Sequence, residues 1–421
     1  MLNWINVVLW LIPRRIRPIW LILAITSFGV MATTTIASAS EIYSKALAQS
    51  GLQHVIATSS PNALNGQLMV HNRPIARADY ESLNSTVNNI IQQRIGFLLD
   101  HTNRRGQTHP NVPFAYSPEP NRASLEILLG RPFFLTQFER YSELTDGNWP
   151  TKDYKIDENG VYLEAVIGDQ AAKSMAISVG DEVFLFPYKT DTTQRITLKI
   201  SGISHPTDPF DPYWLGVPFY FNLQEVDEKP LIPFYVQESA FLDGIGNRFS
   251  SLIGDFGWLL YINTENLRYE AVQDTREAFA GLETDINKKI PRSLLLTLLE
   301  NSRGTGLLAT FQQDLLWSRV PLIMFVALVL AIILYFLFVI LGFLARSRSD
   351  EASIFRSRGT SRTQAICLLT LTEGLIVLAA TITGPFLALL ISKTWLLTTI
   401  QPAGTWESSS AGLSFYTFLW S

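Results

Sequence analysis

The residues of this chain that could do chemistry are scattered along the sequence. It holds no HExxH, no GxSxG and no Gly-Lys-Ser/Thr of a nucleotide-binding loop, so the common motifs for zinc hydrolysis, serine catalysis and ATP binding are missing. Its single cysteine, Cys367, allows neither an intrachain disulfide nor a Cys/His metal spacing. We therefore expect a chain that is not an enzyme, with no catalytic residue, no metal and no cofactor of its own.

One loop offers a cation site as an alternative. His205, Asp208 and Asp211 are separated by prolines in the segment 205–214. Polar residues spaced in this way are typical of turns, in which the side chain caps the backbone. Turn chemistry is the interpretation that we favour here.

The most informative cluster is a basic segment at residues 346–364, which holds five arginines and two acids. Within it, Ile354 and Phe355 form an apolar pair rimmed by Arg356 and Arg358. Such a surface suits a protein partner. The alternative is that the arginines only hold the segment at anionic lipid.

Helix boundaries can be expected at the end of this cluster. Gly359 suits the end of a helix that runs through Arg358, because glycine tolerates the left-handed backbone of a helix terminus. Ser361 suits the start of the next helix, because its hydroxyl can cap free backbone amides.

Two apolar runs flank the basic segment. Residues 320–345 carry no charge over 26 positions, which is roughly 39 Å of helix and exceeds the roughly 30 Å of a hydrocarbon core. The second run, 365–392, is interrupted only by Glu373 and Gly384-Pro385. We expect spans at 319–345 and 365–392, joined by a cytoplasmic turn at 346–364, because arginine concentrates on the cytoplasmic side of membranes.

Glu373 is an acid inside the second run. An intramembrane carboxylate is costly, so it is a functional candidate; the alternative is that it reaches the interface or pairs with Arg362. The Gly384-Pro385 pair predicts a kink in the same helix.

The N-terminus predicts a further membrane segment. Residues 1–17 are apolar, contain two tryptophans and end in three arginines, which indicates a cytoplasmic or interfacial segment. The uncharged run 18–38 has the length of a first span. The rival interpretation is a cleaved signal peptide, since Ala37-Ser38-Ala39 resembles a cleavage site.

Either interpretation places residues 39–318 outside the cytoplasm, as an acidic α+β domain that is a poor nucleic-acid binder. The 3.6-residue spacing of apolar side chains predicts a helix over 78–100. Alternation and turn residues predict the other elements. These are strands at 160–168, 182–188, 195–205 and 257–263, a short helix at 169–176, a turn at 178–181, helical segments at 291–300 and 307–317, and a loop or strand edge at 101–121.

The fold class that we expect is therefore a membrane α-helical protein with three spans plus an α+β extracytoplasmic domain. Residues 393–421 are then an extracytoplasmic tail or the start of a fourth span. We favour a longer protein of which this is a portion, because the apolar run near the end is too short to cross a bilayer.

Two parts of the sequence resemble the FtsX/MacB-like permeases of ABC systems. Residues 349–364 are similar to the cytoplasmic pattern of that family, although Ala352 stands where a branched apolar residue is usual. Residues 147–150, 166–181 and 200–204 resemble the recurrent motif of the family's MacB-like periplasmic core. The positions in register in the cytoplasmic pattern are Glu351, Ile354, Phe355, Arg356, Gly359, Ser361 and Gln364.

The resemblance implies a permease subunit that couples ATP hydrolysis by a separate cytoplasmic ABC ATPase to movement of the outer domain. It further implies contact with the ATPase at Glu351, Ile354, Phe355, Arg356, Arg358, Gly359 and Ser361, a second permease copy or homologous half, and location in a bacterial cytoplasmic membrane. Two alternatives stay open, a regulator of an extracellular hydrolase and a membrane receptor whose outer domain binds a ligand.

Overall fold

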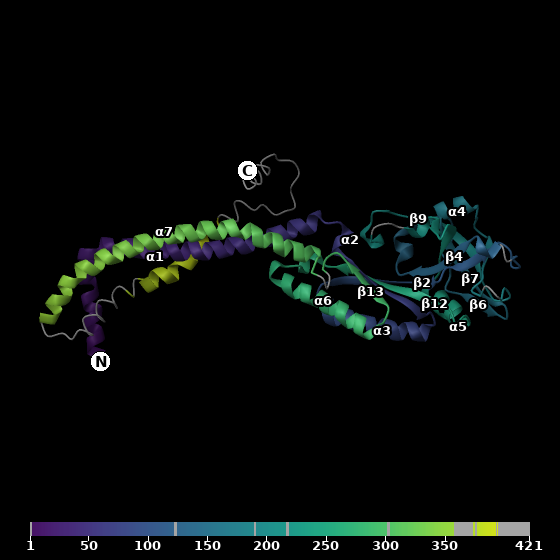
Figure 1. Ribbon diagram of the computed structural model, residues 1–421, viewed down its shortest axis with the longest axis horizontal. Helices are drawn as coiled ribbons and strands as arrows, with labels where there is room; N and C mark the ends of the chain where they lie inside the picture. Colours follow the sequence, from purple (N-terminus) through teal and green to yellow (C-terminus); the bar gives the residue numbers. More distant parts are fainter. Residues whose placement is uncertain are drawn as a thin grey trace. The chain divides into compact units, whose positions relative to one another are not determined.

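The computed structural model of the protein describes residues 2–121, 124–188, 191–215, 219–300, 304–357, 374, 377–392 and 394 (Figure 1). Two compact units divide the chain. The helical unit combines Met1–Gly51 with Asp314–Ser421, and the sheet unit is Leu52–Gln313. We describe each unit by itself.

Two long helices dominate the helical unit. Helix α1 spans Leu2–Thr58 and helix α7 spans Leu307–Ser357. Each contains a segment long enough to cross a membrane, Leu23–Thr58 and Leu307–Ile340, whose most apolar stretches of 18 residues have mean hydropathies of 1.3 and 3.2. Large apolar side chains of α7 point outward, with Phe338 77% exposed. This surface suits lipid, because a water-soluble protein rarely leaves such large apolar patches uncovered.

Two features of the helices bear on the expected boundaries. α1 is continuous from Leu2 and stays helical through Pro13 and Pro18, so residues 1–17 do not form a separate short helix. α7 continues past Arg346 to Ser357, so residues 346–357 of the expected cytoplasmic segment are helical. No proline or glycine stands between Ala345 and Ser357 to stop backbone hydrogen bonding there.

The third expected span is described only in part. Within the described residues, 377–392 form the apolar helix Val377–Ser392. Residues 365–373, and with them Glu373, lie outside the described residues, as does the expected tail 395–421. Two helices of spanning length and a mixed-sheet domain are thus what the described chain contains.

The sheet unit is built on one mixed sheet of thirteen strands. Parallel and antiparallel pairings both occur, for example β7 with β9 in parallel and β2 with β12 antiparallel. The strands are β1 (Gly66–Pro74), β2 (Leu99–His109), β3 (Val112–Ala115), β4 (Leu129–Leu135), β5 (Ser142–Gly147), β6 (Tyr154–Asp157), β7 (Gly160–Gly168), β8 (Glu182–Leu185), β9 (Arg195–Pro206), β10 (Gln224–Val226), β11 (Lys229–Tyr235), β12 (Ile253–Ile262) and β13 (Ser293–Thr297).

Strand β4 joins two parts of this sheet. On one side it pairs in parallel with β11, and on the other side with β3 and then β2. The pairings β4-β11-β7-β9-β8-β3 return to β4 and so close a ring, whereas β2-β12-β1-β13 continues as an open limb that ends at β13. A closed ring has no free edge of its own, but β5, β6 and β10 each pair with one ring strand. These three strands and the end of the limb at β13 therefore leave strand edges.

Two helices cover one face of the open limb. Helix α3 (Arg77–Ile95) buries Val87, Ile90 and Ile91, and helix α6 (Val272–Lys289) buries Phe279 and Leu282. The helices pack against each other (Figure 1). Their apolar residues recur at three and four positions, so each helix presents one stripe to the limb. The helix predicted at 78–100 is confirmed, except that it ends at Ile95 and residues 99–100 begin β2.

Other expectations for this unit hold or fail for identifiable reasons. The strand at 160–168 and the helix at 169–176 are confirmed as β7 and α4 (Asp169–Met175), and Gly180 has the positive φ, +98°, expected in its turn. The helical prediction for 291–300 is wrong, because the leucines of this segment pair with β1 as strand β13. Tertiary pairing overrides local propensity there.

The segment 101–121 is also more ordered than a surface loop. Its first part belongs to β2, which lies between β4 and β12 inside the sheet. Arg104 and Arg105 are accommodated there because each has a partner, Glu238 at 3.1 Å and the Tyr220 hydroxyl at 2.8 Å. Pairing of this kind removes the cost of placing polar side chains in a sheet interior.

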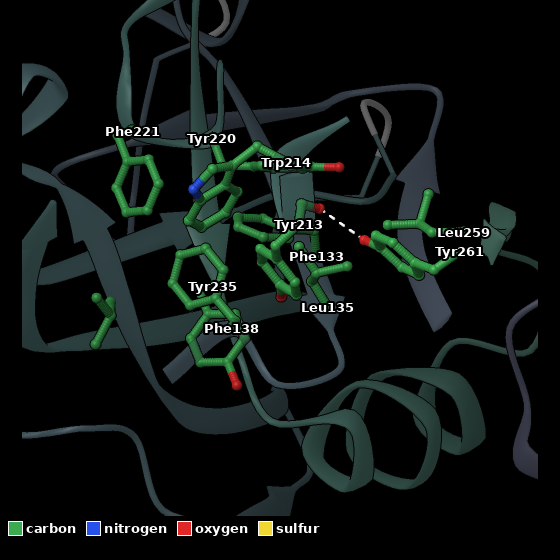
Figure 2. Close-up of a cluster of buried hydrophobic side chains, with 11 residues drawn as sticks. Phe133, Leu135, Phe138, Tyr213, Trp214, Tyr220, Phe221, Tyr235, Leu259 and Tyr261 are labelled. Carbon is green, nitrogen blue, oxygen red and sulfur yellow. Dashed lines mark hydrogen bonds between the residues drawn. The ribbon is translucent and has the colours of Figure 1, made fainter. Parts of the chain in front are cut away.

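An aromatic core lies where the ring meets the limb (Figure 2). The loop after β9, with its short 3-10 helices η3 (Pro212–Trp214) and η4 (Phe219–Phe221), contributes four of the rings. The Tyr261 hydroxyl donates to the backbone oxygen of Tyr213 at 2.7 Å, which fixes the loop to β12 (Figure 2). The buried members are Phe133, Leu135, Phe138, Val166, Tyr213, Trp214, Tyr220, Phe221, Tyr235, Leu259 and Tyr261.

Candidate functional site

The residues expected to contact a partner ATPase fall at the end of α7 and beyond it. The backbone of Glu351, Ile354, Phe355 and Arg356 belongs to the last two turns of this helix. Glu351, Ile354 and Phe355 are spaced by three and four residues and therefore lie on one face of it. Arg358, Gly359 and Ser361 lie outside the described residues, as does the intramembrane candidate Glu373.

The continuity of α7 is the geometric fact that bears most on this segment. From Ala345 the helix extends twelve further residues to Ser357, which is about 18 Å at 1.5 Å per residue. The basic residues Arg346 and Arg348 are therefore part of the same helix as the apolar run. No loop separates them from it.

The helical unit also contains a close approach of α1 to the helix Val377–Ser392. The Thr35 hydroxyl donates to the backbone oxygen of Gly384 at 3.2 Å. A methyl group at Gly384 would overlap the Thr34 side chain, so the two helices meet more closely than a larger residue allows. α1 also meets α7, since a methyl group at Gly29 would lie 2.8 Å from Leu337 Cδ2. Small residues at such contacts are the usual means of packing helices in membranes.

A second site was not expected from the sequence and lies in the sheet unit. A cleft of about 660 Å³ opens beyond the carboxyl end of β4. Its walls come from the end of β4 with the 3-10 helix η2 (Phe138–Arg140), from the loop between β5 and β6, and from the residues after β11. Its volume is in the range of ligand pockets, roughly 300–1,000 Å³.

A carboxylate with unusual partners lies in this cleft. Glu139 Oε1 accepts a hydrogen bond from the Gln237 amide at 2.5 Å and from the Tyr235 hydroxyl at 3.4 Å. Burial, and after it the charge of Glu139, raises the pKa of the Tyr235 phenol above its ordinary value. Among the described residues, no cation pairs with Glu139.

The other charged groups of the cleft are engaged differently. Glu238 is paired with Arg104, whose Nη2 lies 3.1 Å from its Oε2. The Arg140 guanidinium lies 5.8 Å from the centre of the Tyr141 ring, and Lys152 is exposed at the rim. The cleft therefore combines one unpaired carboxylate with cations near its opening.

Aromatic rings form the remaining wall. Phe138 stacks on Tyr235 with ring centres 4.3 Å apart. Trp149 meets both of these rings edge to face, with each pair of centres 6.2 Å apart. The sequence does not indicate this site, because Glu139, Trp149 and Tyr235 are ten to 96 residues apart. The one available indication was that Trp149 belongs to the motif at 147–150.

In the loop 205–214, His205, Asp208 and Asp211 do not converge on a cation site. Asp208 and Asp211 accept hydrogen bonds from the backbone amides of Phe210 and Tyr213, each at 2.8 Å. His205 Nε2 lies 3.9 Å from Glu143. These are turn and surface contacts, as expected. Across the described part of the chain, no group of three or more His, Cys, Asp or Glu residues is placed to hold a metal ion.

Comparison with known proteins gives one match in sequence. Residues 323–421 match the family described as FtsX-like permease C-terminal. No curated protein matches the chain. A crystal structure described as a domain of a permease protein from Porphyromonas gingivalis aligns at 12% identity and a TM-score of 0.25, covering 56% of this chain and 88% of that chain. A score this low is too weak to argue for a shared fold.

Proposed function

We propose that this chain, whose residues 323–421 match the family described as FtsX-like permease C-terminal, is the transmembrane subunit of an ABC-type system driven by a separate ATPase. In this proposal, ATP hydrolysis by the partner moves the extracytoplasmic domain, for export or for extrusion of a lipoprotein or peptide. ATP is bound by the partner, since this sequence has no nucleotide-binding loop of its own.

The observation that carries the proposal is the uninterrupted course of α7 from Leu307 to Ser357. Its apolar part is of spanning length and its last turns carry Glu351, Ile354 and Phe355. A hydrogen-bonded helix passes a displacement along its axis, whereas a flexible linker absorbs it. A partner that pushes on these last turns would thus move the membrane part of the same helix.

The proposed contact has a defined chemistry. Ile354 and Phe355 supply an apolar centre, and Glu351, Arg356 and Arg358 supply charges around it. An apolar centre with a charged rim is the common arrangement of protein interfaces. Gly359 and Ser361 would end this helix and begin the next.

The remaining partners follow from the same proposal. The outward-facing apolar side chains of α7, such as Phe343 at 74% exposed, would contact lipid and a second permease copy or homologous half. The location would be the cytoplasmic membrane of a bacterium, with the sheet unit outside the cell. The end of α7 would then lie in the cytoplasm, in agreement with its arginines.

Co-purification tests the proposal. The chain is expressed together with an ABC ATPase from the same genome, solubilised and captured, and the retained ATPase is quantified. Phe355→Asp places a charge in the apolar centre and is expected to reduce retention at least about tenfold, since an unpaired charge in such an interface costs more than about 1.4 kcal/mol.

Ser353→Asp is the matched control. It adds the same charge two residues away, about 200° around the helix, and retention is expected to stay within about twofold of the unmodified chain. Equal retention by both variants would contradict the proposed contact. An unmodified chain that captures no ATPase would favour a receptor with another cytoplasmic partner.

A further inference from the structure

The cleft beyond β4 is not explained by coupling to an ATPase, because all of its lining residues belong to the sheet unit. We propose that this cleft binds a peptide segment through a lysine or arginine side chain, with Glu139 as the counterion and Trp149 as an aromatic wall. The inference does not depend on the identity of the cytoplasmic partner.

The position of Glu139 makes it a receptor for a cation. Its Oε1 is held by two neutral donors, Gln237 and Tyr235. These donors orient the carboxylate without neutralising its charge. A half-buried carboxylate that lacks a cation gains from a positively charged ligand, because charge-assisted hydrogen bonds are about twice as strong as neutral ones.

The aromatic wall selects the same kind of group. Trp149 is half-buried at the side of the cleft, and it rests on the buried rings of Phe138 and Tyr235. The face of a tryptophan ring attracts ammonium and guanidinium groups within about 6 Å. Carboxylate and indole together therefore favour an organic cation over an inorganic ion.

The rim indicates that the cation is part of a larger ligand. Arg140 and Lys152 also line the cleft and would repel a small isolated cation. They suit the carbonyl and carboxylate oxygens of a chain that carries the cation. The volume of about 660 Å³ accommodates several atoms beyond one side chain. A peptide supplies both features.

The backbone before Glu139 is shaped for this position. Gln137 adopts a left-handed conformation, with φ +65°, directly before η2. A non-glycine residue in this region carries strain, which is found preferentially at binding and catalytic sites. The turn places Phe138 in the core and Glu139 in the cleft.

The test uses the full chain in lipid nanodiscs and isothermal titration calorimetry. The probe is a blocked five-residue peptide with a central arginine flanked by leucines. Its control is the same peptide with citrulline, which has the shape of arginine and no charge. The arginine peptide is expected to bind at least about tenfold more tightly than the citrulline peptide, which corresponds to about 1.4 kcal/mol.

Variants assign the effect to the cleft. Glu139→Gln keeps the shape of the side chain and is expected to abolish the preference for arginine over citrulline. Glu143→Gln removes an exposed carboxylate nearby on β5, outside the cleft, and is expected to leave the preference unchanged. Trp149→Leu, which leaves Glu139 in place, is expected to lower the affinity for the arginine peptide.

Several results would overturn the inference. Equal affinities of the arginine and citrulline peptides for the unmodified chain would show that the positive charge of the ligand does not contribute to binding. An unchanged preference in Glu139→Gln would place the binding elsewhere, and tighter binding of a peptide with central glutamate would show that the rim cations dominate. None of these results bears on retention of the ATPase, so the two proposals fail independently.

Discussion

The guanidinium of Arg276 lies 2.7 Å from the carboxylate of Glu300, whose side chain is only 2% exposed. Arg276 also donates to the side chain of Gln312. One arginine of α6 thus holds both the segment after β13 and the first turns of α7. Within the sheet unit, Arg276 thus connects α6 to the start of α7.

Breaking this pair is expected to be costly. Arg276→Met removes the cation that lies 2.7 Å from the buried Glu300 carboxylate, and we expect the free energy of unfolding to fall by about 3 kcal/mol. The measurement is denaturant unfolding of the full chain in detergent, followed by tryptophan fluorescence. The double variant Arg276→Met with Glu300→Met replaces both charges by apolar groups and is expected to recover most of the loss. If the double variant were as unstable as the single one, loss of the ion pair would not explain the lower free energy of unfolding.

In the helical unit, Gly384 and Gly374 are expected to differ although both lie in the same apolar run. Gly384→Ala would press on Thr34 and disturb the hydrogen bond from Thr35, so we expect a loss of about 1–3 kcal/mol from overpacking. At Gly374 an added methyl group meets no atom of the described residues within 4 Å, and Gly374→Ala is the matched control. Thermal unfolding in nanodiscs measures both. The same melting temperature for the two variants would contradict the close approach of α1 to Val377–Ser392.

Alkaline pH is expected to destabilise the sheet unit. Burial raises the pKa values of Tyr80, Tyr213, Tyr235 and Tyr261 above the ordinary value of 10.0. Above about pH 10 these phenols lose their protons in the unfolded state and keep them in the folded state. The free energy of unfolding therefore falls as pH rises above about 10, by up to about 1.4 kcal/mol per pH unit for each tyrosine. Unfolding free energies from pH 8 to 11 test this.

Tyr80→Phe removes one of these phenols from a site that is 1% exposed and is expected to reduce the slope. A stability that stays constant through pH 11 would contradict the burial of these hydroxyls.

Much of the sheet unit follows from local pattern. In β9 the buried residues alternate with partly exposed ones, as Ile196, Leu198 and Ile200 predict. Gly180 and the cap at Asn263, whose side chain accepts from the Glu265 amide at 3.0 Å, are where turn chemistry places them. These features depend on neighbours in sequence, which is why the sequence is sufficient for them.

Features that depend on distant partners were not predictable in the same way. The leucines of β13 have no strand pattern of their own and become a strand because β1 offers its edge. The cleft depends on Glu139, Trp149 and Gln237, which the closed ring of strands brings together.

We propose that the end of α7 lies in the cytoplasm, where a separate ATPase binds it. In a background of Cys367→Ser, one variant carries Ser357→Cys at the end of α7 and another carries Phe210→Cys in the sheet unit, where the side chain is 89% exposed. A membrane-impermeant thiol reagent is applied to intact cells and to permeabilised cells. The account predicts labelling at position 210 in intact cells and at position 357 only after permeabilisation; labelling of position 357 in intact cells would contradict it.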